Sequence, residues 1–422
     1  MLKQFTKAER GWIMYDWANS AFSAIIAAII LPNFYGTLTS GNLTAGTWWG
    51  YATSLGTFIC AILAPFLGTL GDYRGWKKKL FTAFVLIGVI ATAALGFTAN
   101  WQLLLVFYVI GTVGFNGSCV FYDGFLHDVT TNERMDKVST YGYGLGYIGG
   151  STIPLVVSML LIMFGGKIGV SSTLACQLSF ILTAVWWLVF TIPMWQNVHQ
   201  VHAIDPQGSI AGQTISRMGD MVRRILKNKG LLLFLVAYFF YIDGVGTIIH
   251  MATIFGTNMG LDSNAMIVIL LVVQIVAFPF AILYGKLSGK YGVRGMILFG
   301  IATYMVVCFV ALTLEPLRQL GQMPLMLGFI FLAFLVGTAQ GGIQALSRSY
   351  FGKLVPEDSA NEFFGFFDIF GKFSAVVGPA LFSLVWGATA QVYLGILPVL
   401  SMFVIGMVLF CLVPKDMGKI SD

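Results

Sequence analysis

Residues 68–79 read Gly-Thr-Leu-Gly-Asp-Tyr-Arg-Gly-Trp-Lys-Lys-Lys, and they stand between two long apolar runs at 46–70 and 80–99. A helix of about 20 apolar residues crosses the roughly 30 Å hydrocarbon core of a bilayer. Both runs reach that length. The sequence therefore predicts two neighbouring transmembrane helices joined by a short basic loop.

The same alternation of apolar runs and short polar breaks extends over all 422 residues. Apolar residues make up 57% of the chain and charged residues 10%, against roughly 25% charged in an average soluble domain. This composition excludes a soluble fold and predicts an all-α polytopic membrane protein. Twelve spans are predicted, at approximately 12–36, 46–70, 80–99, 102–127, 138–164, 171–194, 230–257, 264–285, 295–314, 323–347, 362–387 and 393–413.

The basic residues orient these spans. Because the number of spans is even, both termini lie on one side of the membrane. If that side is the cytoplasm, only Lys167 and Arg318 of the 24 lysines and arginines fall outside, and Lys372 falls within a span. This is a strong positive-inside bias. The sequence therefore predicts a multi-pass protein of the cytoplasmic membrane with cytoplasmic termini, and the net charge of +6 requires no nucleic-acid partner.

The chain also repeats itself. The loop at 68–78 has a counterpart at 285–294, in which two glycines and a leucine recur at a shift of 217 residues. Gly142 matches Gly365 at the similar shift of 223 residues. Duplicated units are common in secondary transporters. We expect two pseudo-symmetric six-helix bundles, 1–194 and 230–422, joined by a cytoplasmic linker at 195–229.

The second part of this linker has an amphipathic pattern. Ile215, Met218, Val222 and Ile225 are expected on one helical face, with basic residues elsewhere. A helix with these properties is typical of the membrane surface. A solvated linker is the alternative interpretation.

The loop at 68–78 resembles the loop signature of the major facilitator superfamily, which has a glycine, an aspartate, a second glycine and then basic residues. Gly68, Asp72 and Gly75 match it, but Tyr73 stands where a basic residue is usual and Arg74 follows one place later. The second copy lacks the acid, because it has Gly289. The resemblance implies that this loop has a gating or structural role in closing the inward side.

A narrower resemblance is carried by three segments: Tyr15-Asp-Trp-Ala-Asn-Ser20, Tyr241-Ile-Asp-Gly244, and the residues 341–351 with 362–373. They resemble the vacuole-effluxer-type branch of the superfamily, whose fungal members are implicated in releasing amino acids from the vacuole. The resemblance implies a fold of 12 transmembrane helices and a transport function, with an amino acid as one possible solute.

Polar residues recur in the first, fourth, seventh and tenth predicted spans. A charged residue at a helix centre in lipid costs about 3 kcal/mol or more, so such residues normally face a cavity or a partner. Spans three, six, nine and twelve hold no charged residue in their interiors. We therefore expect a central cavity whose substrate or coupling residues are Asp16, Asn19, Asn116, Asp123, Asp243, His250, Gln340 and Gln344.

The individual roles stay open at this point. Asp243 lies near the middle of its span, where it can carry a proton, bind a cation or cationic group, or tie two helices together. His250 is either a relay or a core histidine. Asp368 and Lys372 form an i,i+4 pair that favours a structural or gating role over substrate contact. Asp16 and Asp123 are candidates for gating and for binding alike.

Other classes of function lack their signatures. Gly144-Leu-Gly-Tyr-Ile-Gly149 fits the dinucleotide pattern but lies within a predicted membrane helix, so it indicates a packing surface. No phosphate loop, metal-spaced cluster or nucleophile with a nearby base is present, and the five cysteines are scattered singly. We predict no enzyme, no cofactor and no metal.

The resulting hypothesis is a monomeric secondary transporter that works by alternating access. It takes a small polar solute through the lipid bilayer, coupled to a proton or cation. A lipid, amphiphile or drug exporter of the same fold is the alternative, and a polytopic membrane enzyme is the third.

Overall fold

The computed structural model describes residues 2–40, 43–206, 210–415, 417 and 420, with side chains except at 43–47, 211, 263, 264, 267 and 372–376. These residues are helical apart from loops and one isolated bridge, between Tyr73 and Ile204. Among the described residues, eleven continuous helical stretches are long and apolar enough to cross a membrane, and some of them, such as Lys7–Leu38, join two or more of the helices named below. The predicted eleventh span lies in α16 (Ala360–Thr389), whose described stretch Val377–Thr389 is apolar but shorter. The all-α membrane fold is therefore confirmed.

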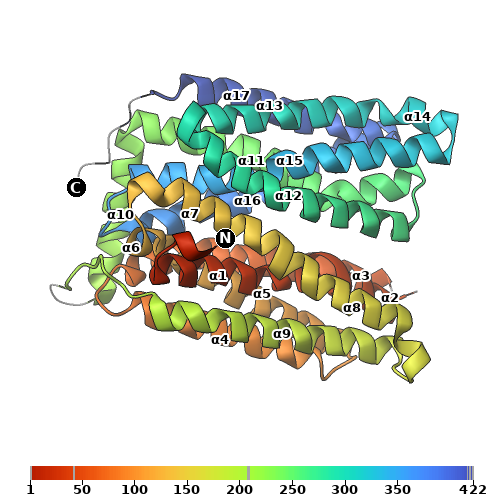
Figure 1. The fold of residues 1–422 in the computed structure, drawn as a ribbon, viewed down its shortest axis with the longest axis horizontal. Helices are drawn as coiled ribbons and strands as arrows, with labels where there is room; N and C mark the ends of the chain where they lie inside the picture. Colours follow the sequence, from red (N-terminus) through yellow and green to blue (C-terminus); the bar gives the residue numbers. More distant parts are fainter. Residues whose placement is uncertain (1, 41–42, 207–209, 416, 418–419, 421–422) are drawn as a thin grey trace. The chain divides into compact units, whose positions relative to one another are not determined.

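Unit 1 consists of Met1–Asn132, Leu145–Gly219 and Glu357–Phe366. In Figure 1, α4 and α9 lie side by side in this unit. Its helices are η1 (Leu2–Gln4), α1 (Lys7–Ala21), η2 (Phe22–Ile29), α2 (Ile30–Leu38), α3 (Leu43–Gly71), α4 (Lys77–Leu95), α5 (Trp101–Gly124), α6 (Leu126–Val129), η3 (Gly146–Thr152), α8 (Ile153–Phe164), η4 (Gly165–Ile168) and α9 (Ser172–Asn197).

Unit 2 consists of Glu133–Gly144, Asp220–Pro356 and Phe367–Asp422. In this unit α12 packs along α15, and α11 packs along α17. Its helices are α7 (Asn132–Leu145), α11 (Lys229–Met259), α12 (Ser263–Tyr291), α13 (Val293–Leu312), α14 (Leu314–Leu320), α15 (Gln322–Leu354), η5 (Val392–Gly395) and α17 (Ile396–Leu412). The linker helix α10 (Ile210–Lys227) and α16 each begin in unit 1 and continue in unit 2.

Polar caps fix where many of these helices begin. Thr6 and Glu9 form a capping box at α1. Asn100, Ser171 and Asn228 each accept hydrogen bonds from the first-turn N–H groups of α5, α9 and α11. These donors have no acceptor within their own helix. The caps therefore place the ends of the spans close to the predicted boundaries.

Two predicted spans are not regular α-helices. η2 and η3 are π-helical segments within the first and fifth spans. On η3, a Cβ at Gly149 would lie 2.0 Å from the ring of Trp17, and one at Gly146 would lie 2.7 Å from Ser20 Oγ. The glycine pattern that fits a dinucleotide motif is thus confirmed as a packing surface against α1.

The predicted helix in the linker is present as α10. Thr214, Met221 and Ile225 are buried, whereas Ile215 is 69% exposed. The side chain of Arg217 turns inward and donates to Glu362 of α16. The position of α10 on the membrane surface stays a prediction.

Candidate functional site

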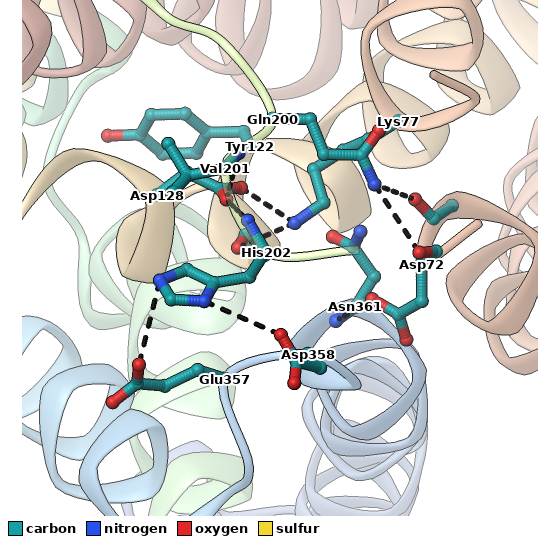
Figure 2. A network of polar contacts seen from close by, with 12 residues as sticks. Asp72, Lys77, Tyr122, Asp128, Gln200, Val201, His202, Glu357, Asp358 and Asn361 are labelled. Atoms are coloured by element: carbon teal, nitrogen blue, oxygen red, sulfur yellow. Dashed lines mark hydrogen bonds and ion pairs between the residues drawn. The ribbon is translucent and has the colours of Figure 1, made fainter. Parts of the chain in front are cut away.

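Asp72 caps the first turn of α16. Its carboxyl is completely buried, Oδ1 accepts a hydrogen bond from the N–H of Asn361 at 3.0 Å, and Oδ2 accepts one from the N–H of Glu362 at 2.9 Å. Both donors belong to a helix N-terminus, where N–H groups lack intrahelical acceptors and the helix dipole favours negative charge. Asp72, which lies in the loop after α3, therefore caps α16 from a distant part of the sequence (Figure 2).

Glycines make this approach possible. A Cβ at Gly68 of α3 would lie 2.3 Å from the backbone oxygen of Asn361, and one at Gly124 of α5 would lie 1.4 Å from the Asn361 side chain. From the other side, a Cβ at Gly365 of α16 would lie 2.3 Å from the backbone oxygen of Ala64. Any larger residue at these positions displaces the start of α16.

Arg217 adds a cation to the same site. Its Nη2 lies 2.5 Å from Glu362 Oε2 and 3.9 Å from Asp72 Oδ2, and its guanidinium lies over the ring of Tyr73. Burial raises the pKa of Asp72 to about 7, although Lys77, the Glu362 N–H and Arg217 each act to lower it. Asp72 therefore titrates near neutral pH. We call Asp72, Arg217, Asn361 and Glu362 the Asp72 cluster.

The linker contacts the backbone of the loop that carries Asp72. Gln200 Nε2 donates to the carbonyl oxygens of Gly71, Asp72 and Tyr73, and its Oε1 accepts from the N–H of Gly75, where φ is +78°. Arg74, a predicted gating residue, is exposed and pairs with Asp205 at 2.5 Å. Its hydrogen bond lowers the pKa of Asp205. The predicted loop signature is thus partly a docking surface for the linker.

A second set of contacts links the linker to α4 and α6. Lys77 Nζ lies 2.7 Å from Asp128 Oδ2, with both side chains buried, and Asp128 Oδ1 accepts from the N–H groups of Val201 and His202. The His202 ring lies 3.5 Å from Glu357 and from Asp358, the residues before α16 (Figure 2). The linker therefore reaches the same helix start as Asp72.

The second copy of the loop is built differently. Gly292 has φ of +77°, like Gly75, and a Cβ at Gly285 would lie 2.1 Å from Thr140 Oγ1 of α7. At Gly289, where the acid is missing, an added Cβ would have no neighbouring atom within 4 Å among the described residues. Two cations of α15 hold α7 instead: Arg348 donates to Ser139 and Lys353 pairs with Asp136 at 2.6 Å.

The polar residues of the first span meet α5 within unit 1. Asp16 Oδ2 accepts a hydrogen bond from Tyr122 Oη at 2.7 Å, and Asn19 Nδ2 lies 3.7 Å from Cys119 Sγ. Asn116 of α5, which was predicted to line the central cavity, donates to Thr112 O of its own helix. Asp123 is half-buried one residue after Tyr122. Asp16 and Asn19 are therefore brought together with α5, through residues the sequence did not single out.

Asp243 lies in the interior of unit 2. Its side chain is completely buried, and Oδ1 accepts a hydrogen bond from the N–H of Gly378 in α16 at 3.0 Å. Its Oδ2 is buried without a hydrogen-bond partner among the described residues. A Cβ at Gly378 would lie 1.8 Å from Thr247 Oγ1 and 2.7 Å from Asp243 Oδ1. This glycine is therefore what allows α16 to reach Asp243.

The remaining predicted residues do not join Asp243. His250 is exposed and bonds to Gly246 O of its own helix. Gln340 is buried, and Gln344 Nε2 donates to the Gln340 backbone oxygen. Asp368 is half-buried, while the side chain of Lys372 lies outside the described residues, so that pair stays a prediction.

Sequence reasoning missed the partners rather than the central acids. Tyr122, Gln200, Arg217 and Gly378 were not expected in either site. The sequence does contain a signal for Gly378. This glycine stands directly before Pro379, and a proline inside a helix marks an irregular point because it cannot donate a helix hydrogen bond. No group of three potential metal ligands occurs in the part of the chain that the structure describes.

Comparison with known proteins gives one family. Residues 44–421 match the family described as "Vacuole effluxer Atg22 like". The chain is 47% identical to the "Uncharacterized MFS-type transporter YxiO" of Bacillus subtilis, covering 99% of this chain and 97% of that protein. It is 29% identical to the "Autophagy-related protein 22" of Botryotinia fuckeliana over 63% of this chain and 48% of the fungal protein.

Solved transporters share the fold. The outward conformation of the major facilitator superfamily transporter FucP superposes with a TM-score of 0.72 at 13% identity, covering 98% of this chain and 99% of FucP. The proton:xylose symporter XylE gives a TM-score of 0.71 at 12% identity, covering 98% and 96%. At these identities the likeness shows the fold alone.

Proposed function

Because the chain belongs to the Atg22-like vacuole effluxer family of major facilitator transporters, and is therefore a secondary transporter and not an enzyme, we propose that it couples movement of a small polar solute to a proton carried by Asp243. The coupling proton, the solute class and the conformational cycle are the parts of this proposal that go beyond the family. Alternating access supplies the cycle in folds of this kind.

The burial of Asp243 carries the proposal. A carboxylate enclosed in a membrane-spanning bundle, with Oδ2 unpaired among the described residues, costs several kcal/mol in its charged form. A proton removes that charge and turns Oδ2 into a donor. Oδ1 can keep the hydrogen bond from Gly378 in either state. The site therefore suits a group that is neutral when enclosed and charged when water reaches it.

The helix α16 connects the proton site at Asp243 to the Asp72 cluster. Asn361 and Glu362 at its start are held by Asp72, and Gly378 further along the same helix is held by Asp243. Gly378 precedes Pro379, which has no N–H, so the helix is locally short of hydrogen bonds here. We expect protonation of Asp243 and release of the Asp72 cluster to act on one helix, which makes that cluster the latch of the cycle.

The test is uptake by proteoliposomes with an imposed pH gradient, using Asp243→Asn. The variant keeps the shape of the side chain but cannot take up or release a proton. We expect gradient-driven accumulation to be lost while exchange of labelled solute across the membrane persists. Asp262→Asn is the matched control, because Asp262 is an exposed N-cap of α12 and asparagine caps equally well. Full accumulation by Asp243→Asn would remove Asp243 from coupling.

The solute must be found first, and an amino acid is our candidate. Asp16, hydrogen-bonded to Tyr122 and close in sequence to Asn19, offers a negative group suited to an ammonium. A thermal-shift screen of the purified protein against amino acids, short peptides, sugars, nucleosides and amphiphiles identifies the class. A shift by amino acids that Asp16→Asn abolishes supports the proposal, and a shift by sugars alone contradicts it. We also propose a monomer with both termini in the cytoplasm.

A further inference from the structure

A cavity lies inside the helix bundle of unit 2, apart from Asp243. It has a volume of about 90 Å³ and is lined by residues of α11, α12, α13, α15, α16 and α17. The lining is almost entirely apolar and includes Met251, Phe255, Met266, Phe329 and Phe382. No Asp, Glu, Lys, Arg or His is among the described residues that line it. A cavity of about 150 Å³ in another protein binds benzene, so this space suits a ligand of a few heavy atoms.

Two amides interrupt the apolar lining. Gln274 of α12 and Gln340 of α15 both line the cavity, and the Oε1 atom of each is buried without a hydrogen-bond partner among the described residues. Gly337, one turn before Gln340, lies against α12: a Cβ there would be 2.7 Å from Val276 Cβ and 3.0 Å from Val273 O. Both amides therefore lie at about the same height along the contact between α12 and α15.

Such amides are costly in an apolar core. An unpaired buried amide oxygen forfeits the hydrogen bond it has in water, at roughly 1–3 kcal/mol. Methionine or leucine would fill the same space without that cost. A bound molecule with an O–H or N–H group would satisfy the oxygen, and its apolar body would contact the methionine and phenylalanine side chains. A charged ligand does not fit, because no lining side chain among those described can neutralise it.

We propose that this cavity is a binding site for a small neutral amphiphile, an uncharged apolar molecule with one hydroxyl or amide donor, which Gln274 and Gln340 recognise. The site goes beyond the transported polar solute, since Asp243 is not part of the lining. Thr247 connects the two: it lines the cavity, and its hydroxyl donates to the backbone oxygen of Asp243. Occupancy of the cavity is therefore positioned to act on the α11 turn that carries Asp243.

The test is photolabelling of the full chain in lipid nanodiscs with 2-(3-methyldiazirin-3-yl)ethanol, a small alcohol that forms a covalent adduct on irradiation. Adducts are mapped by mass spectrometry and competed with butan-1-ol. We expect saturable labelling of cavity residues such as Met251 and Met266. Gln340→Met removes the amide at nearly constant volume, and the loss of one hydrogen bond should weaken apparent affinity about fivefold.

Two further variants make the result decisive. Ala333→Leu fills the cavity from α15 and should abolish the cavity adducts, while thermal unfolding confirms that the variant is folded. Gln322→Met changes an exposed amide of the same helix, outside the lining, and should leave labelling unchanged. Adducts confined to lipid-facing residues such as Phe331, or cavity adducts that survive Ala333→Leu, would overturn the proposal. Because the readout is labelling, it is independent of the transport assay for Asp243.

Discussion

Residues 68–78 and their predicted second copy, 285–294, lie beside helices that are held by different chemistry. Each copy contains a close-packed glycine near the end of a helix, Gly68 of α3 or Gly285 of α12, and a glycine at positive φ beyond that helix, Gly75 or Gly292. The first copy holds α16 through a buried carboxyl that can lose its charge. The helix α7, which lies beside the second copy, is held by Arg348 and Lys353 of α15.

This difference teaches where the fold can respond to protons. Residues 72–76 form a loop between α3 and α4, whereas Gly292 alone separates α12 from α13, and only the first copy contains an acid. Asp72 has a pKa of about 7 because burial outweighs its neighbouring cations. We therefore expect the hold on α16 to be adjustable and the hold on α7 to be permanent.

Replacing the close-packed glycines should give the largest difference between the two copies. In Gly68→Ala the new Cβ meets the backbone oxygen of Asn361, which cannot rotate away, whereas in Gly285→Ala it meets the hydroxyl of Thr140. We expect Gly68→Ala to slow solute exchange about tenfold, equivalent to roughly 1.4 kcal/mol in the barrier, and Gly285→Ala to slow it far less. Initial rates of exchange in proteoliposomes measure this. Equal slowing by both variants would contradict the asymmetry.

The arginines that contact α16 and α7, Arg217 of α10 and Arg348 of α15, should differ in their effect on stability. Arg348 is 4% exposed and donates to both Ser139 Oγ and Ser139 O, so Arg348→Met removes two buried hydrogen bonds. We expect its melting temperature to fall by about 5 °C. Arg217→Met removes a cation that is partly open to solvent and should cost less than half of that. A larger loss for Arg217→Met would reverse our assignment of the permanent hold.

The pH dependence should come from the first copy. A folded-state pKa raised from 3.8 to about 7 means that the enclosed carboxyl favours the proton, so its stabilising contribution is present at low pH and is lost as pH rises through about 7. We expect the melting temperature of the native chain, relative to Asp72→Asn, to decrease between about pH 5 and pH 8. A difference that grows over this range would show that Asp72 is ionised in the enclosed state.

Adding the missing acid should have the smallest effect. A Cβ at Gly289 meets no neighbouring atom among the described residues, so Gly289→Asp is sterically allowed. Since Arg348 and Lys353 already hold α7, we expect exchange rates within about twofold of the native chain and a melting temperature nearly unchanged. A marked gain in stability would show that the second copy still has room for an acidic cap.

The spans could be predicted because they depend on local features. Apolar runs of sufficient length gave α9 and α11 close to their observed ends. The buried acids Asp16 and Asp243 were found because charge within a span is conspicuous.

Partners far apart in sequence could not be predicted in this way. Arg217 pairs with Glu362 across 145 residues, and Gln200 bonds to a loop 127 to 129 residues earlier. Arg217 was one of several linker cations that an amphipathic helix explained equally well. The π-helical segments η2 and η3 were also missed; of the two, only η3 contains glycines, and Gly146 and Gly149 pack against α1.

Hydrogen exchange, followed by mass spectrometry, of the segments 357–366 and 133–144 tests the central claim most directly. In Asp72→Ala the N–H groups of Asn361 and Glu362 lose their acceptors. We predict faster exchange in 357–366, with 133–144 unchanged because its hold depends on Arg348 and Lys353. Unchanged exchange in 357–366, or an equal rise in both segments, would contradict the account of one adjustable and one permanent hold.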